Sequence, residues 1–342
     1  MNILVTGGAG YIASHVVKQL LETTNHDIVI IDNLSTGHQS TLDTLEQIAI
    51  ESGNGDLRFY HADLSDFIAI EKIFLTNTFD VVMHFAASIV VPESVENPLK
   101  YYMNNTVNTT NLVRLCNEYG VKNFIFSSTA AVYGEPSEIP VKETTPTNPI
   151  NPYGVSKLMS ERIIQDTALA NPNFCYVILR YFNVAGADVS NRIGQSFPNA
   201  THLIKVAAQT ALGKREKLSV FGDDYDTSDG TCIRDYIHVD DLASAHLKSL
   251  EYLNNQGTSD IFNCGYGYGF SVKEVIEAVK RVSNSDFHVE LSPRRAGDAA
   301  LLISDNAKIK IRLDWKPQYD NLQLICETAY EWEKLIFSSE IT

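Results

Sequence analysis

The chain has few cysteines and no closely spaced pair of them. Disulfide frameworks and cysteine-ligated zinc sites are built from sets of cysteines at short, recurring spacings. The five cysteines here are odd in number, and no C-x-x-C motif joins any two of them. We therefore exclude both kinds of structure and expect buried thiols at Cys116, Cys175, Cys232, Cys264 and Cys326.

Basic residues are also scarce. Lysine and arginine number 27 against 42 aspartates and glutamates, so the net charge is −15. Phosphate backbones and anionic membranes repel such a chain, which excludes nucleic acid and membrane surfaces as main partners. No apolar run approaches the ~18 residues that cross a bilayer, and residues 1–5 lack the basic segment of a secretion signal. We expect a soluble, cytoplasmic protein.

Metal-ligand motifs are missing as well. None of the nine histidines forms an H-E-x-x-H or similar pair. Residues 224–230 resemble a calcium loop, but Gly230 stands at the seventh position instead of the sixth, and Asp235 replaces the terminal glutamate. We expect no metal site.

Apolar residues, in contrast, are plentiful and recur in a regular order. The 342 residues, 44% of them apolar, suffice for two domains that each bury a core. In the first half, short Val/Ile-rich runs alternate with helical stretches, which predicts an α/β fold with a doubly wound parallel sheet. From Asn183 onward this rhythm degrades. We expect a nucleotide-binding domain at 1–182 and a smaller α/β substrate-binding domain at 183–342, with a possible chain crossover near 230–265.

The expected elements follow from the same periodicity. Proline at positions 98 and 152 suits the first turn of a helix. Strands are expected at 3–6, 27–32, 57–62, 80–85, 123–127 and 175–181, and helices at 14–22, 98–119, 153–169, 207–212 and 272–282.

A glycine-rich turn follows the first expected strand. Gly7, Gly8 and Gly10 stand between this strand and a helix, where a backbone without side chains can approach a pyrophosphate. An ordinary tight turn would look the same. Asp32, however, ends the second strand about 20 residues further on, where a carboxylate accepts hydrogen bonds from a ribose and repels a 2′-phosphate. This combination predicts a Rossmann fold that binds NAD rather than NADP.

Asp63 ends the third strand and is either an adenine contact or a helix cap.

Tyr153 and Lys157 lie four residues apart and so share one face of the helix expected at 153–169. A tyrosine of pKa ~10 has to lose about three units to act as a base near neutrality. One cation at ~4 Å, at an effective dielectric of ~20, supplies about that much. Lys157 and the positive nicotinamide ring of NAD together therefore suffice. Tyr330 and Lys334 repeat the spacing near the C-terminus, where we expect a solvated helix face. Only Tyr153 follows a complete dinucleotide-binding half and the strand-end hydroxyls at 127–129, so we assign it as the base and Lys157 as its support.

Together these motifs resemble the UDP-glucose 4-epimerases, which belong to the extended short-chain dehydrogenases/reductases. The resemblance covers nearly the whole chain, from the first strand to about Trp332. It rests on the Gly-rich loop, Asp32-Asn33-Leu34, His84-Phe85-Ala86-Ala87, Asn123-Phe124-Ile125-Phe126-Ser127-Ser128, Tyr153-x-x-x-Lys157, Leu179-Arg180-Tyr181-Phe182-Asn183 and Arg234-Asp235-Tyr236-Ile237-His238-Val239.

The resemblance implies a mechanism and a set of site residues. NAD takes the hydride from the sugar C4 while Tyr153 takes the hydroxyl proton; the 4-keto sugar then rotates and receives the hydride on its other face. Thr129 matches the hydroxyl that supports the base. The implied cofactor contacts are Gly7, Gly10, Tyr11, Ile12, Asp32, Asn33, Asp63, Leu64, Phe85, Ala86, Asn104, Lys157 and Tyr181. The implied substrate contacts are Thr129, Tyr153, Asn183, Leu203, Phe221, Arg234, Tyr236, Arg295, Asp298 and Leu302.

Some of these substrate contacts have a chemical rationale of their own. Arg234 and Arg295 are suited to a diphosphate because the guanidinium is a rigid two-pronged donor. The family positions place Asn183 near a phosphate and Asp298 near the uridine ribose. Phe221 and Tyr236 match the uracil and phosphate pocket, although an aromatic residue there is as readily part of the core.

The chain departs from the family pattern at three places. Ala13 replaces the third glycine, which the fingerprint tolerates. The family's Gly-x-Lys, whose lysine approaches the cofactor phosphates, reads Ala-Ser-Ile at 87–89, so that contact is missing. Val184 stands where a proline often follows Tyr-Phe-Asn.

Two other functions share parts of this pattern. A 4,6-dehydratase or decarboxylase of the same fold would need an acid after the strand-end threonine, and Ala130-Ala131 stand there instead. A non-enzymatic NAD-binding regulator would not need the intact set of Tyr153, Lys157 and Thr129.

Two finer expectations concern the sugar and the assembly. Leu302 stands where glucose/galactose-specific relatives carry a tyrosine, so we expect turnover of the UDP-GlcNAc/UDP-GalNAc pair as well, unless Leu302 merely packs against its own domain. The resemblance also implies a homodimer, in which helices at 98–119 and 153–169 pair across a two-fold axis into a four-helix bundle. Apolar positions 112, 115 and 116, and 158, 163 and 164, have helical spacing, but they could equally face the monomer's own sheet.

Overall fold

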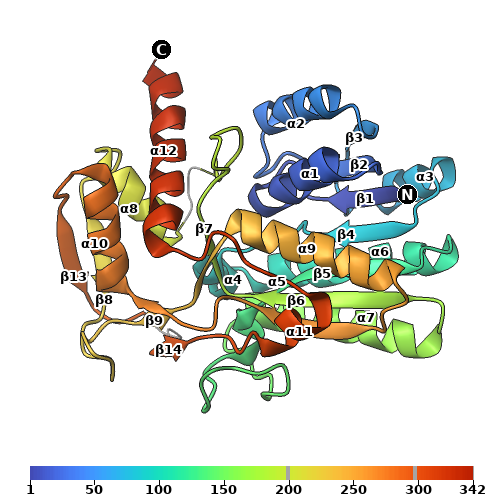
Figure 1. Cartoon of the computed structure of the whole chain (residues 1–342). Helices are drawn as coiled ribbons and strands as arrows, with labels where there is room; N and C mark the ends of the chain where they lie inside the picture. Colours follow the sequence, from blue (N-terminus) through green and yellow to red (C-terminus); the bar gives the residue numbers. More distant parts are fainter. Residues whose placement is uncertain (198–200, 296–298, 342) are drawn as a thin grey trace.

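The computed structural model describes residues 1–197, 201–295 and 299–341, with side chains to 338. Its centre is a sheet of seven parallel strands in the order β11-β6-β5-β4-β1-β2-β3 (Figure 1). The strands are β1 (Asn2–Thr6), β2 (Asp27–Asp32), β3 (Leu57–His61), β4 (Val81–His84), β5 (Asn123–Thr129), β6 (Cys175–Tyr181) and β11 (Asp260–Cys264). This confirms the predicted doubly wound parallel sheet.

The strand order reverses at β1, which has β2 on one side and β4 on the other. Ligands of open α/β sheets bind in the crevice that this reversal opens at the carboxyl ends of the strands. The Gly-rich loop, Asp32, His84 and Thr129 all lie at or directly after such carboxyl ends. The topology therefore gathers the predicted cofactor residues at one edge of the sheet.

Helices cover both faces of the sheet because its strands are apolar on both sides. On one face lie α1 (Tyr11–Thr23), α2 (Gln39–Ser52) and α9 (Val239–Asn254), with α1 in contact with both of the others (Figure 1). On the other face lie α3 (Phe67–Thr76), α6 (Asn108–Glu118) and α7 (Pro152–Ala170). Pro152 occupies the first turn of α7, and the Asn151 side chain caps it by accepting from Gly154 N at 2.9 Å.

The helix expected at 98–119 is not a continuous α-helix. It consists of α5 (Pro98–Tyr101), a π-helical turn η1 (Tyr102–Val107) and α6. Leu112, Leu115 and Cys116 of α6 are fully buried against the chain's own sheet, as is Ile164 of α7. These four apolar positions thus belong to the monomer's core and are not available for pairing between chains, whereas Leu158 and Ile163 of α7 are half-buried.

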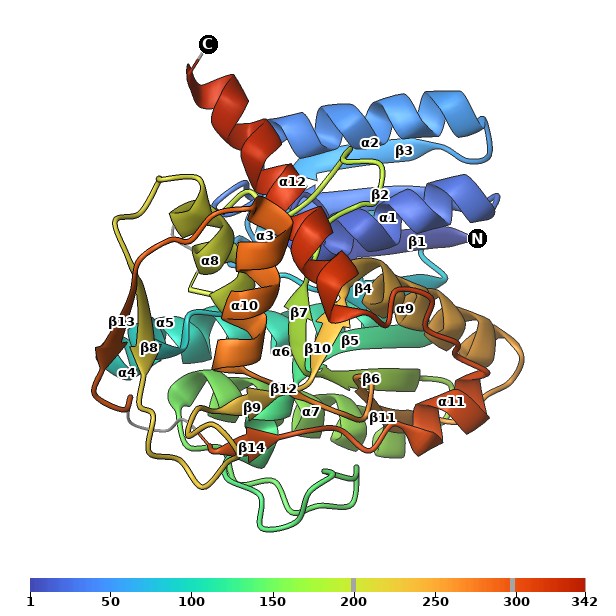
Figure 2. The same ribbon diagram turned by 60° about the vertical axis from the view of Figure 1, so that its left-hand side comes forward.

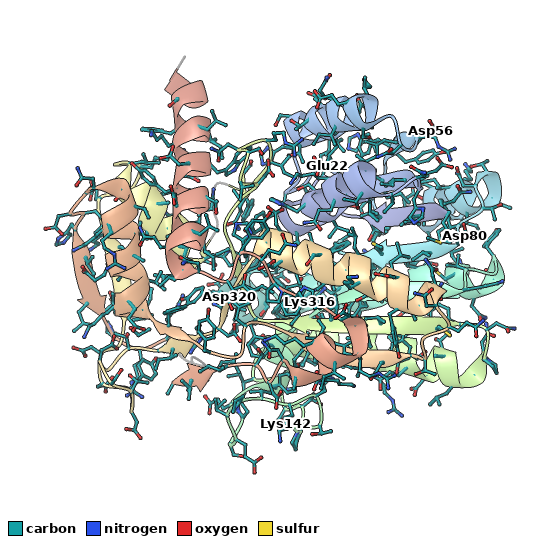
Figure 3. The ribbon with its side chains drawn as sticks, viewed as in Figure 1. Glu22, Asp56, Asp80, Lys142, Lys316 and Asp320 are labelled. Carbon is teal, nitrogen blue, oxygen red and sulfur yellow. The ribbon has the colours of Figure 1, made fainter. Side chains whose placement is uncertain are left out.

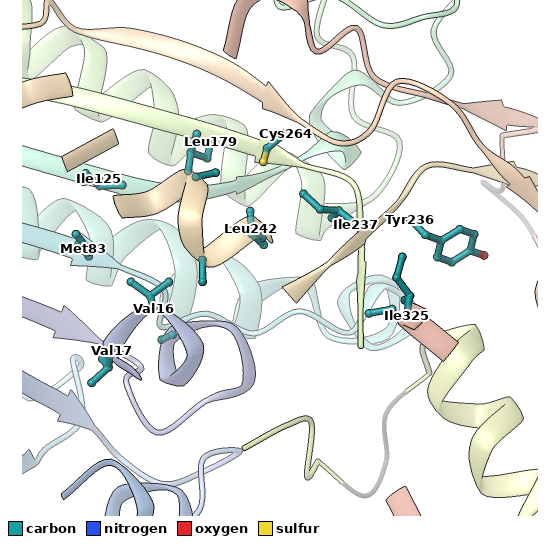
Figure 4. Packing of buried hydrophobic residues seen from close by; sticks show 14 of the residues in the cluster. Val16, Val17, Met83, Ile125, Leu179, Tyr236, Ile237, Leu242, Cys264 and Ile325 are labelled. Carbon is teal, nitrogen blue, oxygen red and sulfur yellow. The ribbon is translucent and has the colours of Figure 1, made fainter. Parts of the chain in front are cut away.

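The chain returns to the large sheet late in the sequence. Helix α9 packs on α1, and β11 forms the edge strand beside β6. The main core therefore contains residues from both halves of the chain. Figure 4 shows part of it, with members from α1 (Val16, Val17), the sheet (Met83, Ile125, Leu179, Cys264), β10 (Tyr236, Ile237), α9 (Leu242) and α12 (Ile325).

The remaining C-terminal residues form a smaller region of helices and short strands. Helices α8 (Leu203–Ala211), α10 (Val272–Ser283) and α12 (Leu322–Ile341) pack against one another, and the pair β8 (Leu218–Phe221) and β13 (Val289–Ser292) lies beside α8 (Figure 2). A capping box between Ser271 and Glu274 begins α10. The other elements are α4 (Val91–Glu96), η2 (Ala130–Tyr133), β7 (Asn183–Ala185), β9 (Ile233–Arg234), β10 (Tyr236–His238), β12 (Phe270–Ser271), β14 (Leu301–Leu302) and α11 (Ala307–Leu313).

Charged side chains such as Glu22, Asp56, Asp80, Lys142 and Asp320 point outward from both regions (Figure 3). The cysteines are free thiols, four of them buried and Cys175 half-buried, largely as expected. No helix in the described ranges has the length and apolarity to span a membrane.

Candidate active site

The Gly-rich loop is a cradle that only glycine can form. Gly7 has φ +76°, and a Cβ there would lie 2.8 Å from Ala86 N. Gly10 donates its N–H to Gly7 O at 3.0 Å and begins α1 without a side chain that caps the helix. The loop therefore presents backbone at the positive end of a 13-residue helix. Ile12 lies in the first turn of that helix, and the Tyr11 hydroxyl donates to Gly186 O at 2.6 Å.

Asp32 is fixed beside this loop. Its carboxylate accepts from Ala9 N at 3.0 Å and from Leu34 N at 2.8 Å, and its exposed fraction is 7%. Burial is the main influence and raises the pKa of Asp32. A buried carboxylate that is hydrogen-bonded to the backbone of the glycine-rich loop fits the ribose and pyrophosphate of a dinucleotide.

The loop after the third strand brings two other predicted cofactor residues together. Asn33 Nδ2 donates to Asp63 Oδ2 at 2.6 Å, and Asp63 also accepts from the hydroxyl and N–H of Ser65. The hydrogen bond from the Ser65 hydroxyl is the main reason that the pKa of Asp63 is low. The cap of α3 is Asp66, so Asp63 is not the helix cap that it could have been. Leu64, next to it, is buried.

Three further cofactor candidates lie around the end of β4. Phe85 donates its N–H to Thr6 O at 3.1 Å, and Ala86 faces Gly7. Asn104 Nδ2 donates to Ser88 Oγ at 3.1 Å from the π-helical turn. Its neighbour Asn105, which the sequence did not single out, accepts from Ser88 N at 2.8 Å and donates to Ser88 O and to Ser156 Oγ. The π-turn thus anchors the segment that replaces Gly-x-Lys, and Ile89 in that segment is 46% exposed.

Tyr153 and Lys157 lie on the buried side of α7, at the ends of β5 and β6. The exposed fractions of Tyr153, Lys157 and Thr129 are 7%, 2% and 8%. Lys157 Nζ donates to Ser127 O at 2.9 Å and lies 4.8 Å from the centre of the Phe126 ring. Tyr181, which ends β6 opposite Thr129, is half-buried.

Burial is the main influence on the ionisation of this pair in the protein alone. Burial raises the pKa of Tyr153, although a hydrogen bond with Thr129 opposes this. Burial also lowers the pKa of Lys157, to about 7. Burial of both groups therefore opposes the shift that we expect from Lys157 and the nicotinamide ring together, and that expectation stays a prediction.

The predicted substrate residues come from short strands and loops that follow the large sheet. Asn183 and Tyr236 are register partners in the β7–β10 pair, and together with Leu203 at the start of α8 they line one pocket. Arg234 and Leu302 are register partners in the β9–β14 pair. The Arg295 guanidinium lies over the Phe221 ring, 4.3 Å from its centre. Tyr236 is buried, which raises its pKa. Asp298 lies outside the described residues.

Asp235 lies between two predicted substrate residues and connects several distant segments by hydrogen bonds. The sequence pattern does not indicate this role. Its buried carboxylate accepts from Tyr266 N at 2.8 Å, from Gly267 N at 3.0 Å and from the Ser304 hydroxyl at 2.6 Å. It thereby holds the segment after Leu302 against Arg234. No sequence signal could have shown this, because its partners lie 31 to 69 residues away.

The segment at 224–230 forms no cation site. Asp224 pairs with Arg294, and Asp229 accepts from Ser271 and Thr231. Within the described ranges, no three His, Cys, Asp or Glu side chains form a group that could hold a metal.

A doubly wound sheet with a glycine cradle, a strand-end carboxylate and a Tyr-x-x-x-Lys helix defines a dinucleotide-binding protein of the dehydrogenase/reductase type. The model of the NAD dependent epimerase/dehydratase family matches residues 3–265, so the chain belongs to that family. This confirms NAD as the expected cofactor.

Individual relatives are similar over nearly the whole chain. The UDP-glucose 4-epimerase of Halalkalibacterium halodurans is 47% identical over 98% of this chain and 96% of its own. The structure of the UDP-Glc/GlcNAc 4-epimerase from Campylobacter jejuni is 57% identical, with a TM-score of 0.85 over 98% of this chain and 99% of that one. The UDP-glucose 4-epimerase of Bifidobacterium longum, solved with NAD+ and UDP, is 37% identical, with a TM-score of 0.91 over 98% of both chains. The resemblance seen in the sequence is confirmed.

Proposed function

We propose that the protein is an isomerase that inverts C4 of a UDP-hexose, using bound NAD. The observation that carries this proposal is the placement of Tyr153, Thr129 and Lys157 at the carboxyl end of the same sheet that holds the glycine cradle and Asp32. A base and a dinucleotide at one crevice can remove a proton and a hydride from one carbinol. The family membership of the chain and the UDP-glucose 4-epimerases among its relatives support the same reaction.

The residues have separate tasks in this reaction. When bound, NAD supplies a hydride acceptor and a positively charged ring. The Tyr153 oxygen takes the proton of the C4 hydroxyl and later returns it, while Thr129 hydrogen-bonds to Tyr153 and fixes the phenol. Removing a proton from oxygen and a hydride from carbon leaves a ketone, and returning both with the hydride on the other face inverts C4. Buried Lys157 favours the phenolate as long as it carries its charge.

The lyase alternative remains disfavoured. Ala130 and Ala131 begin η2 directly after Thr129, where a dehydratase needs an acid. Incubation of the purified protein with UDP-galactose, followed by separation of the products, tests the proposal. UDP-glucose is expected; a 4-keto-6-deoxy sugar would instead support the lyase, and no turnover would support an NAD-binding regulator.

We propose further that the enzyme accepts the N-acetylated pair, UDP-GlcNAc and UDP-GalNAc. Leu302 lies in β14 beside Arg234 and packs against a small apolar cluster that includes Ala130 and Phe182. These two residues are the sequence neighbours of Thr129 and Asn183, which supports a position of Leu302 near the sugar end of the proposed site. A leucine there lacks the outer ring and hydroxyl of a tyrosine, which leaves room for an acetamido group. The name of the Campylobacter jejuni relative, a UDP-Glc/GlcNAc 4-epimerase, supports this proposal.

We also propose a homodimer, formed by a surface other than the buried stripes. Val95, Leu99 and Met103 on α4, α5 and η1 are 63%, 72% and 60% exposed, and Met159 on the adjacent α7 is 47% exposed. We call these four residues the apolar strip. A strip of this kind on neighbouring helical segments suits pairing with a second copy across a two-fold axis.

Two coarser proposals concern organisation and location. The division at residue 182 into a nucleotide-binding and a substrate-binding domain is supported by the change from long to short strands. The return of the chain between residues 230 and 265 is supported by β11, which joins the large sheet. Five free thiols support a reducing compartment, and we propose the cytoplasm.

A further inference from the structure

A buried charge cluster lies directly behind the Tyr153–Lys157 pair. Glu161 is fully buried on α7, one helical turn beyond Lys157. Its carboxylate accepts from the Ser128 hydroxyl at 2.5 Å. It also accepts from Arg180 Nε at 3.0 Å and from Arg180 Nη2 at 2.5 Å. A buried glutamate with this many donors is held rigidly, and its charge is stabilised by them.

The partners of Glu161 are sequence neighbours of the groups that contact the catalytic pair. Ser128 follows Ser127, whose carbonyl accepts from Lys157, and precedes Thr129, which hydrogen-bonds to Tyr153. Ser128 and Arg180 are register partners in the β5–β6 pair. Arg180 is fixed on its other side by the Tyr133 hydroxyl at 3.0 Å. Glu161 therefore ties the ends of two strands to the helix that carries the site.

Several titratable groups face Lys157 from the elements around it. Tyr153 and Glu161 belong to its own helix, and Tyr181 ends β6. His84, at the end of β4, is buried between Thr6 and Thr109, and burial together with Lys157 lowers its pKa to about 3, so it is neutral. Burial lowers the pKa of Lys157, and the charge of Glu161 opposes this. Arg180 is paired with Glu161, and among these groups Glu161 is the one whose charge raises the pKa of Lys157.

We propose that Glu161 is a positioning residue for the reaction, which keeps Lys157 in its ammonium form and fixes the strand ends that carry Thr129 and Tyr181. This proposal rests on the proposed function for its consequence in turnover. The direct effect of Glu161, a change in the ionisation of Lys157, can be measured independently of the proposed function.

The test is Glu161→Gln, which removes the charge and keeps the shape. The ionisation of Lys157 is followed in the NAD-bound protein by NMR of carbon-labelled lysine, with its signal assigned through Lys157→Ala. A unit charge one helical turn away, at an effective dielectric of ~20, predicts that the Lys157 midpoint falls by about one pH unit or more. The alkaline limb of kcat/KM with UDP-galactose is expected to move down by the same amount, because only charged Lys157 supports the base.

The controls separate this role from a general loss of stability. Asp241→Asn removes another buried carboxylate, which accepts from Tyr266, Gln318 and Tyr319 far from Lys157 along the chain. It is expected to lower the melting temperature while leaving the Lys157 midpoint unchanged. Glu161→Asp keeps the charge and is expected to keep the midpoint close to that of the wild type.

One outcome would overturn the role of Glu161, and another would overturn the proposed function. If Glu161→Gln does not fold, Glu161→Gln combined with Arg180→Met removes both buried charges and leaves none unpaired. The midpoint should still fall, by less than in Glu161→Gln, because Glu161 raises the pKa of Lys157 while the loss of the Arg180 charge acts in the opposite direction. An unchanged midpoint in either folded variant overturns the role of Glu161. Absence of wild-type turnover of UDP-galactose would instead overturn the proposed function, whatever the NMR titration shows.

Discussion

The cofactor end and the substrate end of the crevice are built in different ways. At the cofactor end, Gly7, Gly10 and Asp32 are fixed by backbone contacts within the first two strands and their loops. At the substrate end, Asn183, Arg234 and Leu302 come from short strands that pair across more than 50 residues of sequence. The first end is a local feature of one βαβ unit, whereas the second exists only once the whole chain has folded. Variants at the two ends should therefore fail in different ways.

The largest effect is expected at the chemical centre between the two ends. Tyr153→Phe removes the base while keeping the ring, and general acid–base catalysis contributes about three orders of magnitude. Turnover of UDP-galactose should fall by that factor, measured as kcat, while NAD remains bound. Tyr330→Phe is the matched control, because Tyr330 and Lys334 repeat the spacing on α12, where Lys334 is exposed. A Tyr153→Phe enzyme with a tenth of wild-type activity would contradict the assignment.

A smaller effect is expected at the cofactor end from Gly7→Ala. At φ +76° an alanine is strained by about 1–2 kcal/mol. Its Cβ would also lie 2.8 Å from Ala86 N, so the loop has to move. We expect NAD affinity, measured by calorimetry, to weaken roughly ten- to hundredfold.

Gly53→Ala provides the comparison for that variant. Gly53 also has a positive φ, +62°, but no atom lies within 4 Å of the position that a Cβ would take there. Its substitution should lower the melting temperature without changing NAD affinity. Equal losses of NAD affinity in the two variants would mean that backbone strain, and not the shape of the cradle, explains the effect.

The same contrast explains what the sequence could predict. Strands β2 and β6 coincide with their predicted ranges, because a parallel sheet covered on both faces leaves continuous Val/Ile runs. The sequence pattern does not indicate helix α9, which buries polar residues on its packed side. Asp240 is one of them, and its partner His15 lies 225 positions earlier, at 2.8 Å. Such a pair has no local signal.

In the candidate site too, residues that act through distant partners leave no local signal in the sequence. The Gly-rich loop and the Tyr-x-x-x-Lys spacing carry their chemistry within a few residues and could be found directly. Glu161, Asn105 and Asp235 act through partners on other elements, and in the sequence they look like ordinary helix or loop residues. The π-turn that orients Asn105 was also hidden, because nothing in residues 102–107 breaks the pattern of an α-helix.

At the substrate end, Leu302→Tyr should change sugar choice rather than folding. The added ring and hydroxyl would occupy the space that we assign to an acetamido group. We expect kcat/KM for the UDP-GlcNAc/UDP-GalNAc pair to fall roughly tenfold or more relative to the UDP-Glc/UDP-Gal pair, about the effect of one to two kcal/mol of lost fit. The glucose pair serves as the internal control. Equal losses with both pairs, or no wild-type turnover of the N-acetylated pair, would show that Leu302 only packs against its own domain.

The smallest effect on catalysis is expected from the apolar strip, which lies outside both ends of the crevice. Leu99→Glu combined with Met159→Glu places like charges on two helical segments that we expect to face a second copy. Both side chains are largely exposed in the monomer, so its own core should tolerate the change. Light scattering at micromolar concentration should give twice the chain mass of 38.0 kDa for the wild type and the single mass for the variant.

The variant Leu75→Glu, on the exposed side of α3, is the control and should remain dimeric. Because Tyr153, Lys157 and Thr129 come from one chain, kcat should change by less than about twofold, within the range of surface substitutions. A wild type of 38.0 kDa would refute the dimer, and a dimeric variant would show that the interface lies elsewhere.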